Sequence, residues 1–173
     1  MKQVHTSELR ALADTLSAGD EILLSGVVYT ARDAAHKKIN ALLDAGAALP
    51  FPLTDAVIYY AGPTPAREGQ VIGACGPTTS SRMDRYTPRF LREGLVCTIG
   101  KGPRAPEVIA AMREVGGVYL CAIGGAGALA AQAVKKLEVV AFPELGCESV
   151  KRLTIENFPL IVGIDSRGNS LFH

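Results

Sequence analysis

The chain has 173 residues, of which 48% are hydrophobic and 20% charged, so it suits one folded domain with a substantial core rather than a disordered segment. Its formal net charge of +1 argues against a general nucleic-acid-binding protein. No apolar run approaches the length of a membrane span, and the first residues lack the basic start and apolar stretch of a signal peptide. We therefore expect a cytoplasmic protein that binds neither nucleic acid nor membrane.

Hydrophobic periodicity predicts strands alternating with helices. Leu9, Leu12 and Leu16 recur at helical spacing and predict a helical lead-in over residues 1–19. The expected strands are 21–30, 56–61, 70–74, 95–99, 118–123, 137–141, 153–155 and 160–164. The expected helices are 31–43, 81–93 and 106–115, and a tight strand-to-helix turn is expected at 124–129. The connections are short and several strands could pair antiparallel, so we expect an α/β chain with a mixed sheet, forming a single layered domain over residues 1–173.

The cysteines are too widely spaced for a metal motif of the CxxC kind, which uses one turn to aim two thiolates at one metal. They are Cys75, Cys97, Cys121 and Cys147. A disulfide framework is not expected in a cytoplasmic protein of this size. The pattern favours small, buried, hydrophobic side chains.

The segment GPTTSSRMD, residues 76–84, is the clearest candidate for binding chemistry. It follows a predicted strand and leads into a predicted helix, where free backbone N–H groups and hydroxyls would favour an anion. Arg82 follows Thr78 by four residues, about one helical turn, and a guanidinium is suited to bind a carboxylate through two hydrogen bonds. The residues alone leave open an ordinary helix cap with Arg82 in solvent.

A second segment, residues 31–38, begins a predicted helix directly after a strand. Arg32, His36 and Asn40 would share a helical face opposite the apolar stripe. Asp33 and Lys37 are spaced for a surface ion pair. The alternative is a solvated amphipathic face without a binding role.

A third cation, Lys101, lies between Gly100 and Gly102, where an exposed backbone would let a ligand approach closely. A structural turn explains this pattern equally well, and the spacing is not that of a P-loop. Together, three segments each place a cation beside glycines or hydroxyls, which suggests an anionic ligand of the dicarboxylate class. No obvious strong base or metal site accompanies them, so the chain is expected to form part of a site.

Five stretches of the sequence resemble, in order, the beta subunit or C-terminal domain of class I iron–sulfur fumarases and L-tartrate dehydratases. They are GDEILLSGVVYTARDAAHKKI, AVIYYAGPTP, GACGPTTSSRMDRYTP, IGKG and FPELGCESVKRLTIENFP, and they cover nearly all of residues 19–172. The resemblance implies a swivelling β/β/α domain and a hydro-lyase reaction, the reversible dehydration of malate to fumarate. L-tartrate or another hydroxy acid is the alternative substrate. A non-catalytic module that binds small anions is the alternative function.

By this resemblance, Arg32, Arg82 and Lys101 hold the substrate's carboxylates, and Thr78 is the base that removes the C3 proton. A [4Fe–4S] cluster is implied in a partner alpha subunit, with none bound by this chain alone. The active site would lie between the two subunits, so a hetero-oligomer is expected. A homodimer is the alternative for the isolated chain.

One departure from the family pattern follows PELG. Relatives commonly carry a methionine and, four residues later, a tryptophan, where this chain has Cys147 and Lys151. The departure leaves the four proposed site residues intact. We expect it to alter packing or the contact with the partner.

Overall fold

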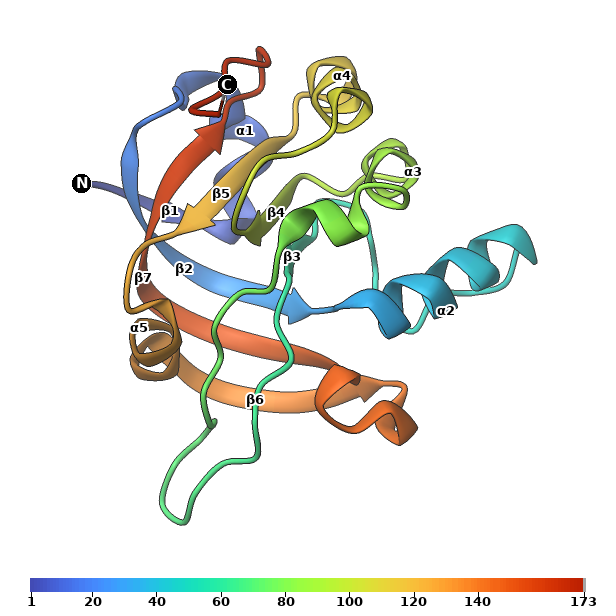
Figure 1. The fold of residues 1–173 in the computed structure, drawn as a ribbon, viewed down its shortest axis with the longest axis vertical. Coiled ribbons are helices and arrows are strands. Elements are labelled where there is room, and N and C mark those ends of the chain that lie inside the picture. The colour runs from blue at the N-terminus through green and yellow to red at the C-terminus, as the bar shows by residue number, and fades with distance from the viewer. Residues whose placement is uncertain (173) are drawn as a thin grey trace.

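A computed structural model describes residues 1–172, whose seven strands form one mixed sheet (Figure 1). The strands are β1 (Lys2–His5), β2 (Glu21–Thr30), β3 (Val57–Tyr59), β4 (Cys97–Gly100), β5 (Val118–Ala122), β6 (Val134–Ala141) and β7 (Val150–Ile164). Their order is β1-β2-β3-β4-β5-β7-β6, with a further pairing between β2 and β7. The pairings from β2 through β3, β4, β5 and β7 back to β2 therefore close a ring. The predicted α/β class with a mixed sheet is confirmed.

Strands β1 to β5 are mutually parallel, whereas β7 runs antiparallel to β2, β5 and β6. The carboxyl ends of β2, β3 and β4 therefore meet at one edge of the sheet. In sheets with parallel strands this edge is where ligand groups commonly gather.

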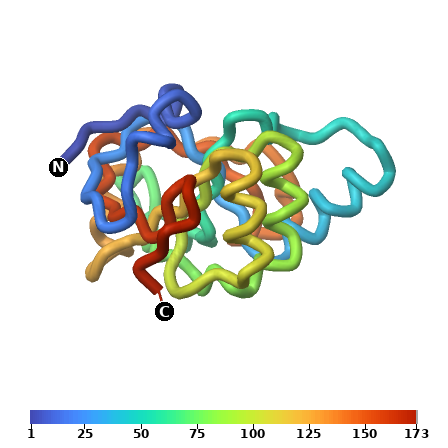
Figure 2. The backbone as a smooth tube through the Cα atoms, turned by 90° about the horizontal axis from the view of Figure 1, so that it is seen from above, coloured from blue at the N-terminus to red at the C-terminus, as the bar shows by residue number. Residues whose placement is uncertain are grey.

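Short and long helices cover the sheet. The α-helices are α1 (Leu9–Leu12), α2 (Asp33–Asp44), α3 (Thr87–Arg92), α4 (Pro106–Val115) and α5 (Ala126–Ala133). The 3₁₀ turns are η1 (Thr6–Glu8), η2 (Ala13–Thr15), η3 (Ser80–Met83) and η4 (Pro143–Glu148). Helices α3 and α4 lie side by side, and with α2 they occupy one side of β3 and β4 (Figures 1 and 2). Among the described residues, no helix combines the length and hydrophobicity needed to cross a membrane.

The core has two parts because the strands of the ring bury both faces. On β3, Val57 and Tyr59 point into the cluster enclosed by the ring, while Ile58 points into the cluster beneath α2, α3 and α4. Such double burial requires apolar side chains at successive positions rather than an apolar–polar alternation. The sequence of β3 meets this requirement with three apolar or aromatic residues in a row.

Several predicted elements have different limits in the structure. The strand 21–30 and the helix 106–115 are confirmed residue for residue. The lead-in begins with strand β1 and contains only short helical turns, so a helix over residues 1–19 is wrong. The predicted helix 81–93 is divided into η3 and α3, since Pro88 favours a new helix start.

Two further differences concern strands. Residues 153–155 and 160–164 belong to one strand, β7, because β2 pairs with the intervening segment as well. The strand predicted at 70–74 is absent from the described structure. This stretch lies in a loop that projects from the sheet toward β6 (Figure 1), where the amide of Thr64 bonds the carbonyl oxygen of Ala74 at 3.0 Å.

Candidate active site

The four candidate residues lie in segments that follow β2, β3 and β4 at their carboxyl ends. Arg32 is the N-cap of α2, and Lys101 follows β4 directly. The amide of Thr78 donates to the carbonyl oxygen of Tyr60 at 2.7 Å, just beyond β3. Thr79 pairs in parallel with Lys101. The backbones that carry Thr78 and Lys101 are thus in contact, at the edge where Arg32 leaves β2.

The segment around Thr78 differs from its prediction. It runs extended beside the ends of β3 and β4, and the amide of Ser80 donates to the carbonyl oxygen of Lys101 at 3.0 Å. The amides of Thr78 and Ser80 are therefore already bonded, and η3 is one short 3₁₀ turn. The long helix predicted from residue 81 is therefore wrong, whereas the anion site predicted at this segment stays a prediction.

Close packing joins η3 to β4 at Gly100. A Cβ atom at this position would overlap the hydroxyl oxygen of Ser80 and lie 2.8 Å from Cδ2 of Tyr60. Only glycine leaves room for this approach. Lys101 can therefore lie next to the Thr78–Ser80 segment because residue 100 is a glycine and has no side chain.

A buried arginine, which the sequence did not single out, supports the same region from beneath. The guanidinium of Arg104 donates to four side chains, at distances of 2.7–3.0 Å: Asp84, Thr98, Tyr60 and Thr87. The side chain of Arg104 is fully buried. This network connects β4, the end of β3, and the two helical pieces η3 and α3. Its role is structural, because every bond is internal.

Arg82 bonds a residue adjacent to Arg32. Its Nη2 donates to Oδ2 of Asp33 at 2.5 Å, and about half of the Arg82 side chain is exposed. Asp33 therefore pairs with Arg82, and the predicted ion pair between Asp33 and Lys37 is wrong. Within residues 1–172 Arg82 makes no other hydrogen bond, so its Nε and Nη1 groups remain available to a ligand. Asp33 therefore places a negative charge among the candidate cations, which its position in the sequence did not predict.

Unpaired polar atoms are concentrated at the first turn of α2. Three side-chain atoms are buried there without a hydrogen-bond partner among the described residues: Nε of Arg32, Oδ1 of Asp33 and Nε2 of His36. A buried polar atom left unpaired costs roughly 1–3 kcal/mol. An acceptor such as a carboxylate would satisfy Nε of Arg32. The first turn of α2 therefore offers a donor to an anion at Nε of Arg32, whereas Oδ1 of Asp33 requires a donor of its own.

His36 is fully buried, so the helical face that it was predicted to share with Arg32 and Asn40 is not a solvated one at this position. Its ring stacks on Phe90 with centroids 5.2 Å apart, and Tyr60 and Tyr86 lie close by. Burial, reinforced by the charge of Arg104, lowers the pKa of His36 to about 4. The neutral ring can donate from Nδ1 to the carbonyl oxygen of Arg32, 2.8 Å away. His36 therefore orients the backbone of Arg32.

The cysteines of the described residues are not grouped with other potential metal ligands. Three of them are buried, and burial raises the pKa of the thiols of Cys75 to about 12 and Cys121 to about 11, and that of Cys97 further. No group of three His, Cys, Asp or Glu side chains with metal-binding geometry occurs in the described part of the chain.

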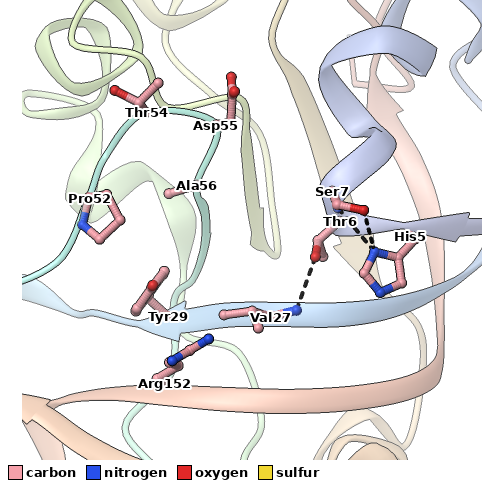
Figure 3. A pocket seen from close by; sticks show the side chains of 10 residues that line it. All are labelled: His5, Thr6, Ser7, Val27, Tyr29, Pro52, Thr54, Asp55, Ala56 and Arg152. Atoms are coloured by element: carbon pink, nitrogen blue, oxygen red, sulfur yellow. Dashed lines mark hydrogen bonds between the residues drawn. The ribbon is translucent and has the colours of Figure 1, made fainter.

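A cavity of about 250 Å³ opens elsewhere, between η1, β2 and the loop before β3 (Figure 3). At its edge, Nδ1 of His5 lies 2.7 Å from the hydroxyl of Ser7 and also accepts the amide of Ser7, as a cap of η1. The hydroxyl of Thr6 accepts the amide of Val27 at 3.0 Å. These contacts stabilise the turn, and none of the four candidate residues lines the cavity.

Comparison with known proteins identifies the family. The family model described as "Fumarase C-terminus" matches residues 2–173. The chain is 41% identical over 156 residues to "Fumarate hydratase 2" of Leishmania major and 40% identical over 167 residues to "Fumarate hydratase class I, anaerobic" of Escherichia coli. These alignments cover 89% and 95% of this chain, but the chain spans only about 30% of the length of these relatives.

A shorter relative is matched over most of its length. The chain is 42% identical over 163 residues to the "Putative L(+)-tartrate dehydratase subunit beta" of Methanocaldococcus jannaschii, an alignment that covers 91% of this chain and 84% of that protein. The family match extends over nearly the whole chain, including the segments that carry Arg32, Thr78, Arg82 and Lys101. The chain therefore belongs to the fumarase C-terminus family.

Proposed function

We propose that this chain is the beta subunit of a two-subunit iron–sulfur hydro-lyase and provides the carboxylate-binding half of the active site. One observation carries the proposal. The segments that carry the four candidate residues meet at the carboxyl edge of β2, β3 and β4; these residues are Arg32, Thr78, Arg82 and Lys101. At this edge Nε of Arg32 is buried without an acceptor among the described residues. The family membership, from which the roles of these residues were inferred, supports the proposal as well.

The charge of this edge favours an anion. Arg32, Arg82 and Lys101 contribute three positive charges, while Asp33 and Glu148 place two negative charges at the start of α2, so the positive charges are in excess. A carboxylate-bearing substrate such as malate or fumarate suits this excess. Fumarate hydration is our first candidate because most of the similar proteins are named fumarate hydratases. Dehydration of L-tartrate is the second, favoured by the relative that resembles this chain over most of its own length.

In the proposed mechanism, the two arginines and Lys101 bind and orient the carboxylates while Thr78 takes the proton from C3. A threonine hydroxyl is a weak base, so it needs activation when the substrate is bound. Cations close to the substrate would stabilise the negative charge that develops on its carboxylate as the proton leaves. The hydroxyl of Thr78 makes no hydrogen bond with the described residues, so it is free to face a ligand.

We place the [4Fe–4S] cluster in a partner alpha subunit, because the residues described here do not form its ligand set. The name of the Methanocaldococcus relative, a beta subunit, supports a partner of this kind. The cluster would supply the electrophile that the leaving hydroxyl requires. This chain would then bind the substrate's carboxylates and help to exclude water when the partner covers the site.

The test is to purify the chain together with a cluster-binding alpha subunit under anaerobic conditions and to measure turnover of both fumarate and L-tartrate. The expected result is rapid hydration of fumarate by the complex and none by either chain alone. Turnover of L-tartrate alone would select the second candidate. A complex with a full complement of iron that converts neither compound would refute the proposal and favour a binding module without catalysis.

A further inference from the structure

The turn η4 packs against the beginning of α2, the helix that Arg32 caps (Figure 1). Oε1 of Glu148 accepts the amide of Ala34 at 3.3 Å, which satisfies one of the free N–H groups at the helix start. At the other end of the turn, Glu144 pairs with Lys38 at 3.1 Å. The position of the first turn of α2 therefore depends on η4.

A second contact transmits the position of η4 to the Arg32 side chain. A Cβ atom at Gly62 would lie 3.0 Å from the carbonyl oxygen of Cys147, 3.2 Å from Cδ of Arg32 and 3.5 Å from Nη1 of Arg32. Gly62 is thus enclosed between the turn and the arginine. The Cys147 carbonyl and the Arg32 side chain therefore border the same small space beside Gly62, so a shift of the carbonyl changes the room left for the arginine.

Lys151 fixes the conformation of this turn. Its Nζ donates to the carbonyl oxygens of Cys147 at 2.9 Å, of Gly146 at 3.2 Å and of Ser149 at 3.2 Å. All three N–H groups of the ammonium are therefore used, and none of its partners among the described residues is a carboxylate. The lysine is only 7% exposed. Three carbonyl dipoles that point to one place repel each other unless a cation lies between them.

We propose that Lys151 is a positioning residue for Arg32: it holds the carbonyls of η4 in place, and η4 in turn sets Arg32 for the substrate's carboxylate through Glu148 and Gly62. The inference rests on the proposed function, because it assigns Arg32 to substrate binding. Direct binding of substrate by Lys151 is excluded by its three internal hydrogen bonds. Burial lowers the pKa of Lys151, in agreement with an ammonium that is held away from water, although the thiols of Cys147 and Cys75 oppose this shift.

The test compares Lys151→Met with Lys136→Met in the anaerobic complex with the alpha subunit. Lys136 is an exposed lysine on β6, the strand beside β7, and serves as the matched control. Lys151→Met should raise KM about fivefold to tenfold while kcat changes less than about twofold, because binding geometry is disturbed and the chemical groups remain. Lys136→Met should leave both constants unchanged.

A double-mutant cycle separates positioning from general damage. In an Arg32→Met background, Lys151→Met should raise KM by less than about twofold, since its effect passes through the missing guanidinium. An equal increase of KM in both backgrounds would overturn the proposal, as would an unchanged KM in Lys151→Met. If Lys151→Met does not fold, Gly62→Ala disturbs the same contact from the opposite side and should show the same dependence on Arg32.

A spectroscopic measurement on the full chain alone does not require activity. In an NMR spectrum of arginine side chains, Lys151→Met should shift the Nε–H resonance of Arg32, whereas Lys136→Met should not. An unshifted resonance would overturn the proposal even if the complex is active. An inactive wild-type complex, with the Arg32 resonance shifted in Lys151→Met, would instead refute the proposed function and leave the structural coupling established.

Discussion

Nη2 of Arg82 donates a 2.5 Å hydrogen bond to Oδ2 of Asp33, a residue forty-nine positions earlier in the chain. The bond joins η3 to the start of α2, and it places a carboxylate among the cations of the proposed site. The charge of Asp33 offsets part of the repulsion between Arg82 and Arg32, the residue that precedes Asp33 in the chain. The remaining N–H groups of Arg82 have no hydrogen-bond partner among residues 1–172 and can bind a ligand.

Arg82→Ala should impair substrate binding much more than folding. A charged hydrogen bond to a carboxylate contributes roughly 1.5–3 kcal/mol, so KM for fumarate should rise about tenfold or more. The exposed pair with Asp33 contributes only about 0–1 kcal/mol to stability. Steady-state kinetics and thermal unfolding of the complex provide both values. Arg89→Ala is the matched control, because Arg89 pairs with Asp44 at the far end of α2. Equal kinetics in the two variants would mean that Arg82 is an ordinary surface residue.

His36 should make the chain sensitive to acid. Its pKa is about 4 in the folded chain against 6.5 for an ordinary histidine, so between these pH values the unfolded chain binds a proton that the folded chain does not. The corresponding stabilisation is complete above pH 6.5 and is lost as the pH falls toward 4, by about 3 kcal/mol in total.

The test is to measure the free energy of unfolding in urea for the wild type and for His36→Phe, at several pH values between 7 and about 4. Phenylalanine retains the stacking on Phe90 but cannot be protonated, so the free energy of unfolding should fall less steeply with acid. The difference between the two slopes isolates His36 from the other titrating groups. Parallel slopes would contradict the buried, neutral histidine.

Arg104→Met should destabilise the fold. Its removal leaves the carboxylate of Asp84, which is only 13% exposed, without its charge partner. Breaking a buried pair in this way costs about 3–5 kcal/mol. Arg92→Met is the control, since its pair with Glu114 is more than half exposed on both sides and is worth about 0–1 kcal/mol. Urea denaturation measures the free energy of unfolding of both variants. Similar losses of stability in the two would show that the Arg104 network stabilises the fold no more than an exposed ion pair does.

Gly100→Ala should disturb η3 and Lys101 together, because the new methyl group would overlap the hydroxyl of Ser80. Overpacking of this kind costs about 1–3 kcal/mol. Gly124→Ala is a suitable comparison, since a Cβ atom there meets no atom within 4 Å. A thermal unfolding midpoint that falls only in Gly100→Ala confirms the close approach of η3 to β4. Unchanged midpoints in both variants contradict it.

Local patterns predicted the regular elements well where one face of the element meets the core. Strand β2 and helix α4 match their predicted limits because alternation and helical periodicity continue without interruption. His36 could not be placed in the same way. The partner of its ring, Phe90, is distant in the sequence, and helical periodicity alone does not reveal a second packing surface on α2.

The candidate site was predicted through residue types, the helical spacing of Thr78 and Arg82, and a family resemblance. None of these could identify the contacts that orient the cations. The bond from Arg82 to Asp33 requires η3 to meet α2, and the three bonds of Lys151 require the turn η4, which local propensity does not specify. Such groups are recognised only once the fold brings distant segments together.

The most direct test of the account is the rate of fumarate hydration by the anaerobic complex that carries Thr78→Val. This substitution keeps the shape of the side chain and removes the hydroxyl. If Thr78 moves the C3 proton, kcat should fall by about a hundredfold or more, as expected for the loss of a general base, with KM and iron content close to those of the wild type. A Thr78→Val complex that hydrates fumarate at the wild-type rate would contradict the proposal that this chain provides the base of the reaction.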